Sequence, residues 1–272
     1  MKKNQQFFHN KIATALLVYF VAIVVWWLMI FFSGLVDDIQ NYLFGLFFAL
    51  IPFFGGITGL WHSRQWGGIK STIGRTLTFL SLGLITWAIG TFIFAYYNLV
   101  LAVAVPYPSI ADLAYIISWP LWALGMVNLS RATGVTFQLR KTGGKIGLLV
   151  IPILIIFASY YLLFIVARGG EIDWSGGMLK LFFDLAYPVG DIVILSLAIL
   201  VYGLSFNYLG GKFKIPIIII LIGFLLSYFA DFSFSYTTTV ETFYVASWVD
   251  LLFATTMFFL SLGINLIRPS DD

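Results

Sequence analysis

The chain has 272 residues, of which 61% are hydrophobic and only 10% are charged. A soluble domain typically carries about 25% charged residues, so this composition excludes an ordinary soluble protein. The net charge of +3 is too small to indicate nucleic-acid binding, and the lack of cysteine excludes disulfides, Cys-based zinc sites and thiol catalysis. Both histidines, His9 and His62, lie in basic segments outside the apolar runs, so we expect no haem, no metal site and no other cofactor.

Eight apolar segments are long enough to cross a bilayer, because a membrane-spanning helix needs about 20 mostly apolar residues. The first is too long for a signal peptide and is followed by no clear small-residue cleavage site, so we interpret it as a retained helix. The predicted fold is therefore all-α, a polytopic bundle of eight transmembrane helices in a lipid bilayer. The segments are 13–35, 42–61, 77–97, 110–128, 146–166, 181–204, 215–236 and 244–266.

The basic residues predict the orientation of the bundle, because Lys and Arg in short loops favour the cytoplasmic side. With eight crossings, every Lys and Arg except Arg168 and Lys180 falls on one side. We therefore predict that both termini are cytoplasmic and that the protein is a multi-pass protein of the cell membrane. We expect one integral domain over 1–272, in which 1–76 form a first helical hairpin with a basic loop and 77–268 form a six-helix core.

The fourth segment begins with two polar residues that have two interpretations. Ser109 and Asp112 have the spacing of a capping pair, in which an acid near a helix N-terminus stabilises the helix start. Asp112 also shares one helical face with Tyr115 and Trp119, which indicates a polar site within the bundle. Both interpretations stay open at this point.

The sixth segment places Asp184, Tyr187, Pro188 and Asp191 on one helical face, because they follow the i, i+3, i+4, i+7 spacing. Pro188 has no N–H to donate and leaves the carbonyl of Asp184 without its helical partner. Such a carbonyl is tolerated at membrane depth where it lines protein or water. Asp191 is the deepest acid of the segment, so it cannot be explained as a cap.

The last two segments also carry acids. Asp231 approaches the end of a helix where the dipole disfavours a negative charge, so we expect it to have a partner or to be solvated. Asp250 lies beside Trp248, and it caps the last helix if that helix starts at Ser247 rather than at Tyr244. The sequence leaves these two starts open.

A short pattern occurs twice, as Asp112-Leu-Ala-Tyr115 and as Asp184-Leu-Ala-Tyr187, each near the same end of a helix and each followed by a proline. We interpret the core as repeated helical hairpins in one orientation. This arrangement differs from the inverted halves of many secondary transporters.

The stretch from Pro108 through Tyr115, continuing to Trp119-Pro120, resembles a multi-pass membrane region that precedes output domains in some bacterial diguanylate cyclases and in some bacterial and archaeal histidine kinases. That region often shows Pro-Ser-x-x-Asp-x-x-Tyr and a following Tyr-Pro, and then an aspartate-bearing Tyr-Pro helix similar to 184–191. Trp119 replaces the usual Tyr, and no cyclase, kinase or other output domain is expected in this chain. The resemblance implies a sensory module that signals through a separate cytoplasmic or membrane partner.

The leading hypothesis is a membrane sensor or ligand-binding module, not an enzyme, with an acidic and aromatic cavity for a small or cationic ligand. One alternative is a proton- or cation-coupled transporter, because intramembrane acids and a kinked helix suit ion relay. Another is an eight-span membrane hydrolase with paired carboxylates, for which no catalytic residues are assigned. The expected ligand-binding residues are Asp112, Tyr115, Trp119, Asp184, Tyr187, Pro188, Asp191, Asp231, Trp248 and Asp250.

Overall fold

The structure is a computed structural model that describes residues 10–133, 135, 139–171, 177–205 and 213–269. Within these residues the regular secondary structure is entirely helical, and eight helices are long and apolar enough to cross a membrane. The predicted all-α bundle with eight spans is confirmed. A bilayer is therefore the environment of the protein, because so many apolar side chains on the outside of the bundle need an apolar solvent.

Each predicted span coincides with an observed one, although the ends move by several residues. In chain order the helices are α2 (Lys11–Ser33), α3 (Ile39–Phe48), α4 (Leu50–Gln65), the short 3-10 helix η1 (Gly68–Lys70), α5 (Thr72–Leu99), α6 (Ile110–Ala132), α8 (Thr142–Ser159), the π-helix η2 (Tyr160–Val166), α9 (Gly177–Ser205), α10 (Lys214–Thr239) and α11 (Trp248–Leu266). The second span combines α3 with α4, and the fifth combines α8 with η2.

Polar caps explain why the helix ends differ from the edges of the apolar segments. The Ser71 hydroxyl accepts a hydrogen bond from the Gly74 N–H at 2.9 Å, so α5 begins at Thr72 rather than at residue 77. At the last span the N-cap is Ser247, and the helix begins at Trp248. Of the two starts that the sequence leaves open, the one at Tyr244 is therefore wrong.

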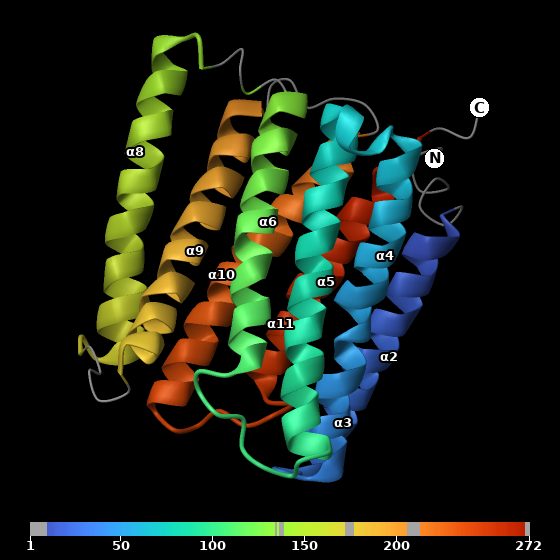
Figure 1. The fold of residues 1–272 in the computed structure, drawn as a ribbon, viewed down its shortest axis with the longest axis vertical. Coiled ribbons are helices and arrows are strands. Elements are labelled where there is room, and N and C mark those ends of the chain that lie inside the picture. Colours follow the sequence, from blue (N-terminus) through green and yellow to red (C-terminus); the bar gives the residue numbers. More distant parts are fainter. Residues whose placement is uncertain (1–9, 134, 136–138, 172–176, 206–212, 270–272) are drawn as a thin grey trace.

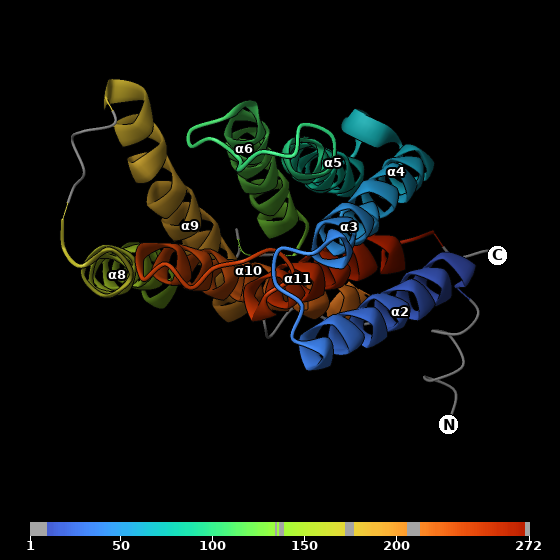
Figure 2. The same ribbon diagram turned by 90° about the horizontal axis from the view of Figure 1, so that it is seen from below.

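The eight spans form two rows (Figure 2). One row contains α9, α6, α5 and α4, and the other contains α8, α10, α11 and α2. α2 begins and α11 ends at the same end of the bundle (Figure 1), as an even number of crossings requires. Which side of the membrane this end faces stays a prediction from the basic residues.

The hairpins α5–α6 and α10–α11 approach closely at glycines. A Cβ atom added at Gly125 of α6 would lie 2.6 Å from the Leu80 side chain, and one added at Gly263 of α11 would lie 2.6 Å from Ile220. These glycines follow the capping acids of their helices, Asp112 and Asp250, at the same spacing. The shared spacing supports repeated hairpins, which stay a prediction.

The first span is tied to the last by hydrogen bonds near both of its ends. At its start, the Asn10 side-chain amide donates to the Asn265 carbonyl at 2.9 Å. Toward its other end, the Trp27 indole N–H donates to the Ala246 carbonyl, also at 2.9 Å. Buried amide and indole donors of this kind need a partner, so these contacts fix α2 in register with α11.

We predict that the end of the bundle where α2 begins is cytoplasmic. Because the chain has no cysteine, a single cysteine introduced at Val103, in the loop at the opposite end, should react with a membrane-impermeant maleimide on intact cells. A cysteine at Thr142, at the basic end, should react only after permeabilisation. The reverse labelling pattern would contradict the predicted orientation.

Candidate functional site

Helix α9 carries the predicted polar face, and its side chains contact three different parts of the bundle. Asp184 faces the loop before α6 and the end of the fifth span, Tyr187 faces α6, and Asp191 faces α10. The i, i+3, i+7 spacing places the three on successive turns, each turn rising about 5 Å. The polar face thus extends from one end of the bundle toward the middle of the membrane.

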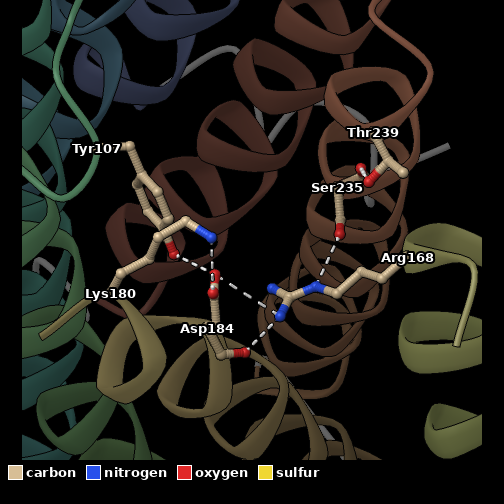
Figure 3. A network of polar contacts seen from close by, with 6 residues as sticks. All are labelled: Tyr107, Arg168, Lys180, Asp184, Ser235 and Thr239. Atoms are coloured by element: carbon tan, nitrogen blue, oxygen red, sulfur yellow. Dashed lines mark hydrogen bonds and ion pairs between the residues drawn. The ribbon is translucent and has the colours of Figure 1, made fainter. Parts of the chain in front are cut away.

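Asp184 lies at the outermost turn, at the centre of a network of charges (Figure 3). The Tyr107 hydroxyl donates to Asp184 Oδ1 at 2.8 Å, and Lys180 Nζ donates to Oδ2 at 3.3 Å. The guanidinium Nη1 of Arg168 lies 3.8 Å from Oδ1. The carboxyl group is 17% exposed, so its ion pairs are screened less than pairs on an open surface.

Tyr107 lies in the loop between α5 and α6, outside the spans. Burial of its hydroxyl end, and then the hydrogen bond to Asp184, raise the pKa of Tyr107 above its usual value. The phenol therefore stays a hydrogen-bond donor to Asp184 throughout the neutral pH range.

The carbonyl that Pro188 leaves without a helical partner is satisfied by Arg168. Arg168 Nη1 donates to the Asp184 carbonyl oxygen at 2.7 Å, and Arg168 Nε donates to Ser235 Oγ of α10 at 3.3 Å. One guanidinium thus joins the end of the fifth span to α9 and α10. The sequence predicted the free carbonyl but not its partner. One feature of the sequence could have indicated this partner: Arg168 and Lys180 are the two basic residues predicted at the end of the bundle where Asp184 lies.

Asp112 has both of the roles that the sequence left open. Its Oδ2 accepts the Ser109 N–H at 2.7 Å, which completes a capping box at the start of α6. Its Oδ1 accepts the Tyr187 hydroxyl at 2.8 Å. The tyrosine of the second Asp-Leu-Ala-Tyr copy therefore binds the aspartate of the first, and this bond fixes α9 against α6.

Tyr115 and Trp119 continue the face of α6. Tyr115 donates to Thr91 Oγ1 of α5 at 3.2 Å, whereas the Trp119 ring meets the Tyr187 ring edge-on, with centroids 4.9 Å apart. A Cβ atom added at Gly190 would lie 1.9 Å from the Trp119 ring, so only glycine allows α9 this close. Trp119 and Gly190 also line an apolar groove of about 270 Å³ between α6 and α9, which contains none of the predicted acids, so the acidic cavity stays a prediction.

The deepest polar contact joins Asp191 of α9 to Asp231 of α10. The two carboxyl groups lie close enough to act on one another, and Ser227 lies one turn before Asp231 on α10, close to its carboxyl group. Asp191 is 6% exposed, and both acids lie inside spans. A direct hydrogen bond between two carboxyl groups requires a proton on one of them, so this pair is suited to hold a proton between two helices. The partner expected for Asp231 is thus a second acid.

Other polar groups surround this pair. The charge of Arg168 is close enough to attract a negative charge on Asp191. Asp191 in turn is close enough to interact electrostatically with the Tyr228 hydroxyl. The hydroxyls of Tyr228 and Ser159 are 2.9 Å apart and join α10 to the fifth span just before the π-helix η2. Single π turns within helices are frequent at functional sites, so the position of η2 beside this pair is consistent with a functional site here.

The last two predicted residues lie apart from the hydrogen-bonded network of α9. Asp250 Oδ2 accepts the Ala246 N–H at 2.7 Å and so stabilises the start of α11 as a local cap. Trp248 is 49% exposed on the outside of the bundle. Within the described residues, no group of three His, Cys, Asp or Glu is placed to hold a metal ion.

No family model, curated protein or solved structure matches this chain. The resemblance to the input regions of cyclases and kinases therefore depends on its motif residues alone and stays a prediction. The function must be argued from the geometry of the α9 face.

We predict that Arg168→Gln lowers the free energy of unfolding by about 1–3 kcal/mol, because it removes the donor to the Asp184 carbonyl and one of the two cations beside the Asp184 carboxyl group. Lys145→Gln is a matched control, since Lys145 is exposed at the other end of the bundle. It should change the stability by less than about 0.5 kcal/mol. Denaturant unfolding in a mild detergent measures both. Equal stability of the two variants would show that the Arg168 contacts contribute nothing.

Proposed function

We propose that the chain is a membrane-embedded sensor module that binds a proton or a small cation at Asp191 and Asp231. The observation that carries this proposal is the pair of adjacent carboxyl groups, on two neighbouring helices, at membrane depth. Acids within membrane spans are energetically costly, and they typically mark sites of binding or relay. Helix contact alone does not require such a pair, because apolar side chains of similar volume often stabilise an interface as well or better.

The polar face of α9 provides a row of polar groups between the end of the bundle and the carboxyl pair. Asp184 lies at the end of the bundle, Tyr187 and Asp112 lie one turn deeper, and Asp191 follows one turn beyond them. A cation that binds the inner pair displaces the shared proton and replaces the direct hydrogen bond between the carboxyl groups. Loss of the proton without a cation leaves two like charges close together, which repel at low dielectric.

Either event changes how α9 packs against α10, and the proposed output is a movement of the two helices at the opposite, basic end. Their connection there includes residues 206–212, which lie outside the described residues. A separate signalling partner that binds the basic loops would receive the movement. The proposal of a separate partner depends on the sequence resemblance alone.

A proton- or cation-coupled transporter is the second candidate, and the same shared proton favours it. A transporter also needs a polar path from the pair to the basic end of the bundle. On that side of the pair, Ser227 lies one turn from Asp231, and the buried hydroxyl of Ser196 on α9 has no hydrogen-bond partner among the described residues. A sensor needs no such path, so the sensor is the better supported of the two.

Spin labels test the proposed movement, because the chain has no native cysteine. Cysteines at Gly203 and Ile215 place one label near the inner end of α9 and one on α10, both at exposed positions. We expect the distance between the labels to increase as the pH rises and the pair loses its proton. Asp191→Asn should abolish this change, because an amide keeps the shape of the side chain but does not become charged as the pH rises.

Glu241→Gln is the matched control, because Glu241 is an exposed acid outside the α9 network. This variant should keep the full pH response. An unchanged response in Asp191→Asn would contradict the proposed site. Flux of protons or Na⁺ in liposomes that depends on Asp191 would favour the transporter over the sensor.

A further inference from the structure

The first span carries a second candidate binding surface, far from the α9 face in the bundle. α2 lies at the edge of the bundle (Figure 2). Its outer side forms an open, shallow groove of about 570 Å³ whose lining residues all belong to α2. The groove has a lysine at one end, a threonine one turn further, and mainly apolar side chains along the rest of its length. Its lining residues are Lys11, Thr14, Ala15, Val18, Tyr19 and Ala22.

The length of the groove matches one leaflet of a bilayer. From Lys11 to Ala22 the helix rises about 16 Å. The hydrocarbon core is about 30 Å thick, so the groove extends from the surface to about the middle of the membrane. For a span that begins at Lys11, we expect this residue at the membrane surface and Ala22 near the ends of the acyl chains.

The walls of the groove are built to be apolar. Ala15 and Ala22 are small, exposed residues, and they leave room beside the helix. Tyr19 could offer a polar hydroxyl, but that hydroxyl donates to the Phe47 carbonyl of α3 at 3.0 Å. The tyrosine therefore presents its ring to the groove, and Lys11 is the one charged group along it.

The charge at the mouth of the groove is positive and uncompensated. Lys11 is exposed and has no ion-pair partner among the described residues. Every other described basic residue except Arg168 and Lys180 belongs to the same end, and no described acid does. These residues are Arg64, Lys70, Arg75, Arg131, Arg140, Lys141, Lys145, Lys214 and Arg268. An anionic group at this surface is therefore attracted.

We propose that this groove binds an anionic phospholipid of the leaflet at the basic end, with its phosphate at Lys11 and one acyl chain beside Ala15, Val18 and Ala22. The order of groups along the groove, a cation followed by an apolar wall one leaflet long, is the order that such a lipid complements. The site is independent of the proposed sensor function, because it shares no residue with the α9 face.

Charge also distinguishes this occupant from a second copy of the chain. Two copies in one membrane are related by an axis along the membrane normal, so a symmetric contact through α2 pairs the same surface with itself. Such a contact brings the two Lys11 side chains together at the same depth, and like charges repel. A lipid phosphate instead neutralises Lys11.

Native mass spectrometry of the delipidated protein in a mild detergent tests the proposal. Palmitoyl-oleoyl phosphatidylglycerol is the anionic probe, and the phosphatidylcholine with the same chains is the neutral one. We expect the wild type to retain the anionic lipid at least threefold more than the neutral one. Lys11→Gln should lose this preference, and Ala22→Phe, which fills the groove, should lower the retention of both lipids.

Two variants serve as matched controls. Lys145→Gln removes an exposed cation from the same end of the bundle, and Ala158→Phe enlarges an exposed alanine of α8. Both should retain lipid as the wild type does. Equal retention by Lys11→Gln and Lys145→Gln would overturn the headgroup contact. If the protein is a dimer that Ala22→Phe dissociates, and if lipid retention does not change, the result would contradict lipid binding in this groove and indicate that a second copy of the chain binds there.

Discussion

The contact between the carboxyl groups of Asp191 and Asp231 sets the central constraint on this structure. Two carboxyl groups inside a membrane cannot both be charged at close range without a large electrostatic cost. In the function that we propose, a shared proton removes that cost and joins α9 to α10. The packing of the two helices would then depend on whether the proton is present. This dependence is the physical basis of the proposed sensor.

The contacts of the outer turns position this pair. Tyr187 binds Asp112 and fixes α9 against α6, while Arg168 joins the end of the fifth span to α9 and α10. Gly190 allows the Trp119 ring to pack directly on the backbone of α9. These three contacts hold the outer half of α9 in place. A change at Asp191 is therefore transmitted more readily toward the basic end, where the described polar contacts of α9 are fewer.

The sequence predicts the fold well because the signals are strong: eight long apolar segments, and caps such as Ser109 with Asp112. It also predicts the shared face of α9, which follows from helical periodicity alone. Partners across the bundle are not predictable in this way. Arg168 is close to Asp184 only because the fifth span packs against α9, and Asp231 pairs with Asp191 only because α10 does. Trp248 is 49% exposed, and the side from which a tryptophan beside an acid faces a neighbour cannot be predicted from the sequence either.

Infrared spectroscopy of the carbonyl stretch measures the shared proton most directly. At neutral pH the wild type should show a protonated-carboxyl band that shifts in frequency in both Asp191→Asn and Asp231→Asn and is unchanged in Glu241→Gln. A shift is expected because the remaining acid loses its carboxyl partner, while its burial at membrane depth still favours the neutral form. A wild-type spectrum without this band, or a band that neither variant changes, would contradict the shared proton and the function proposed from it.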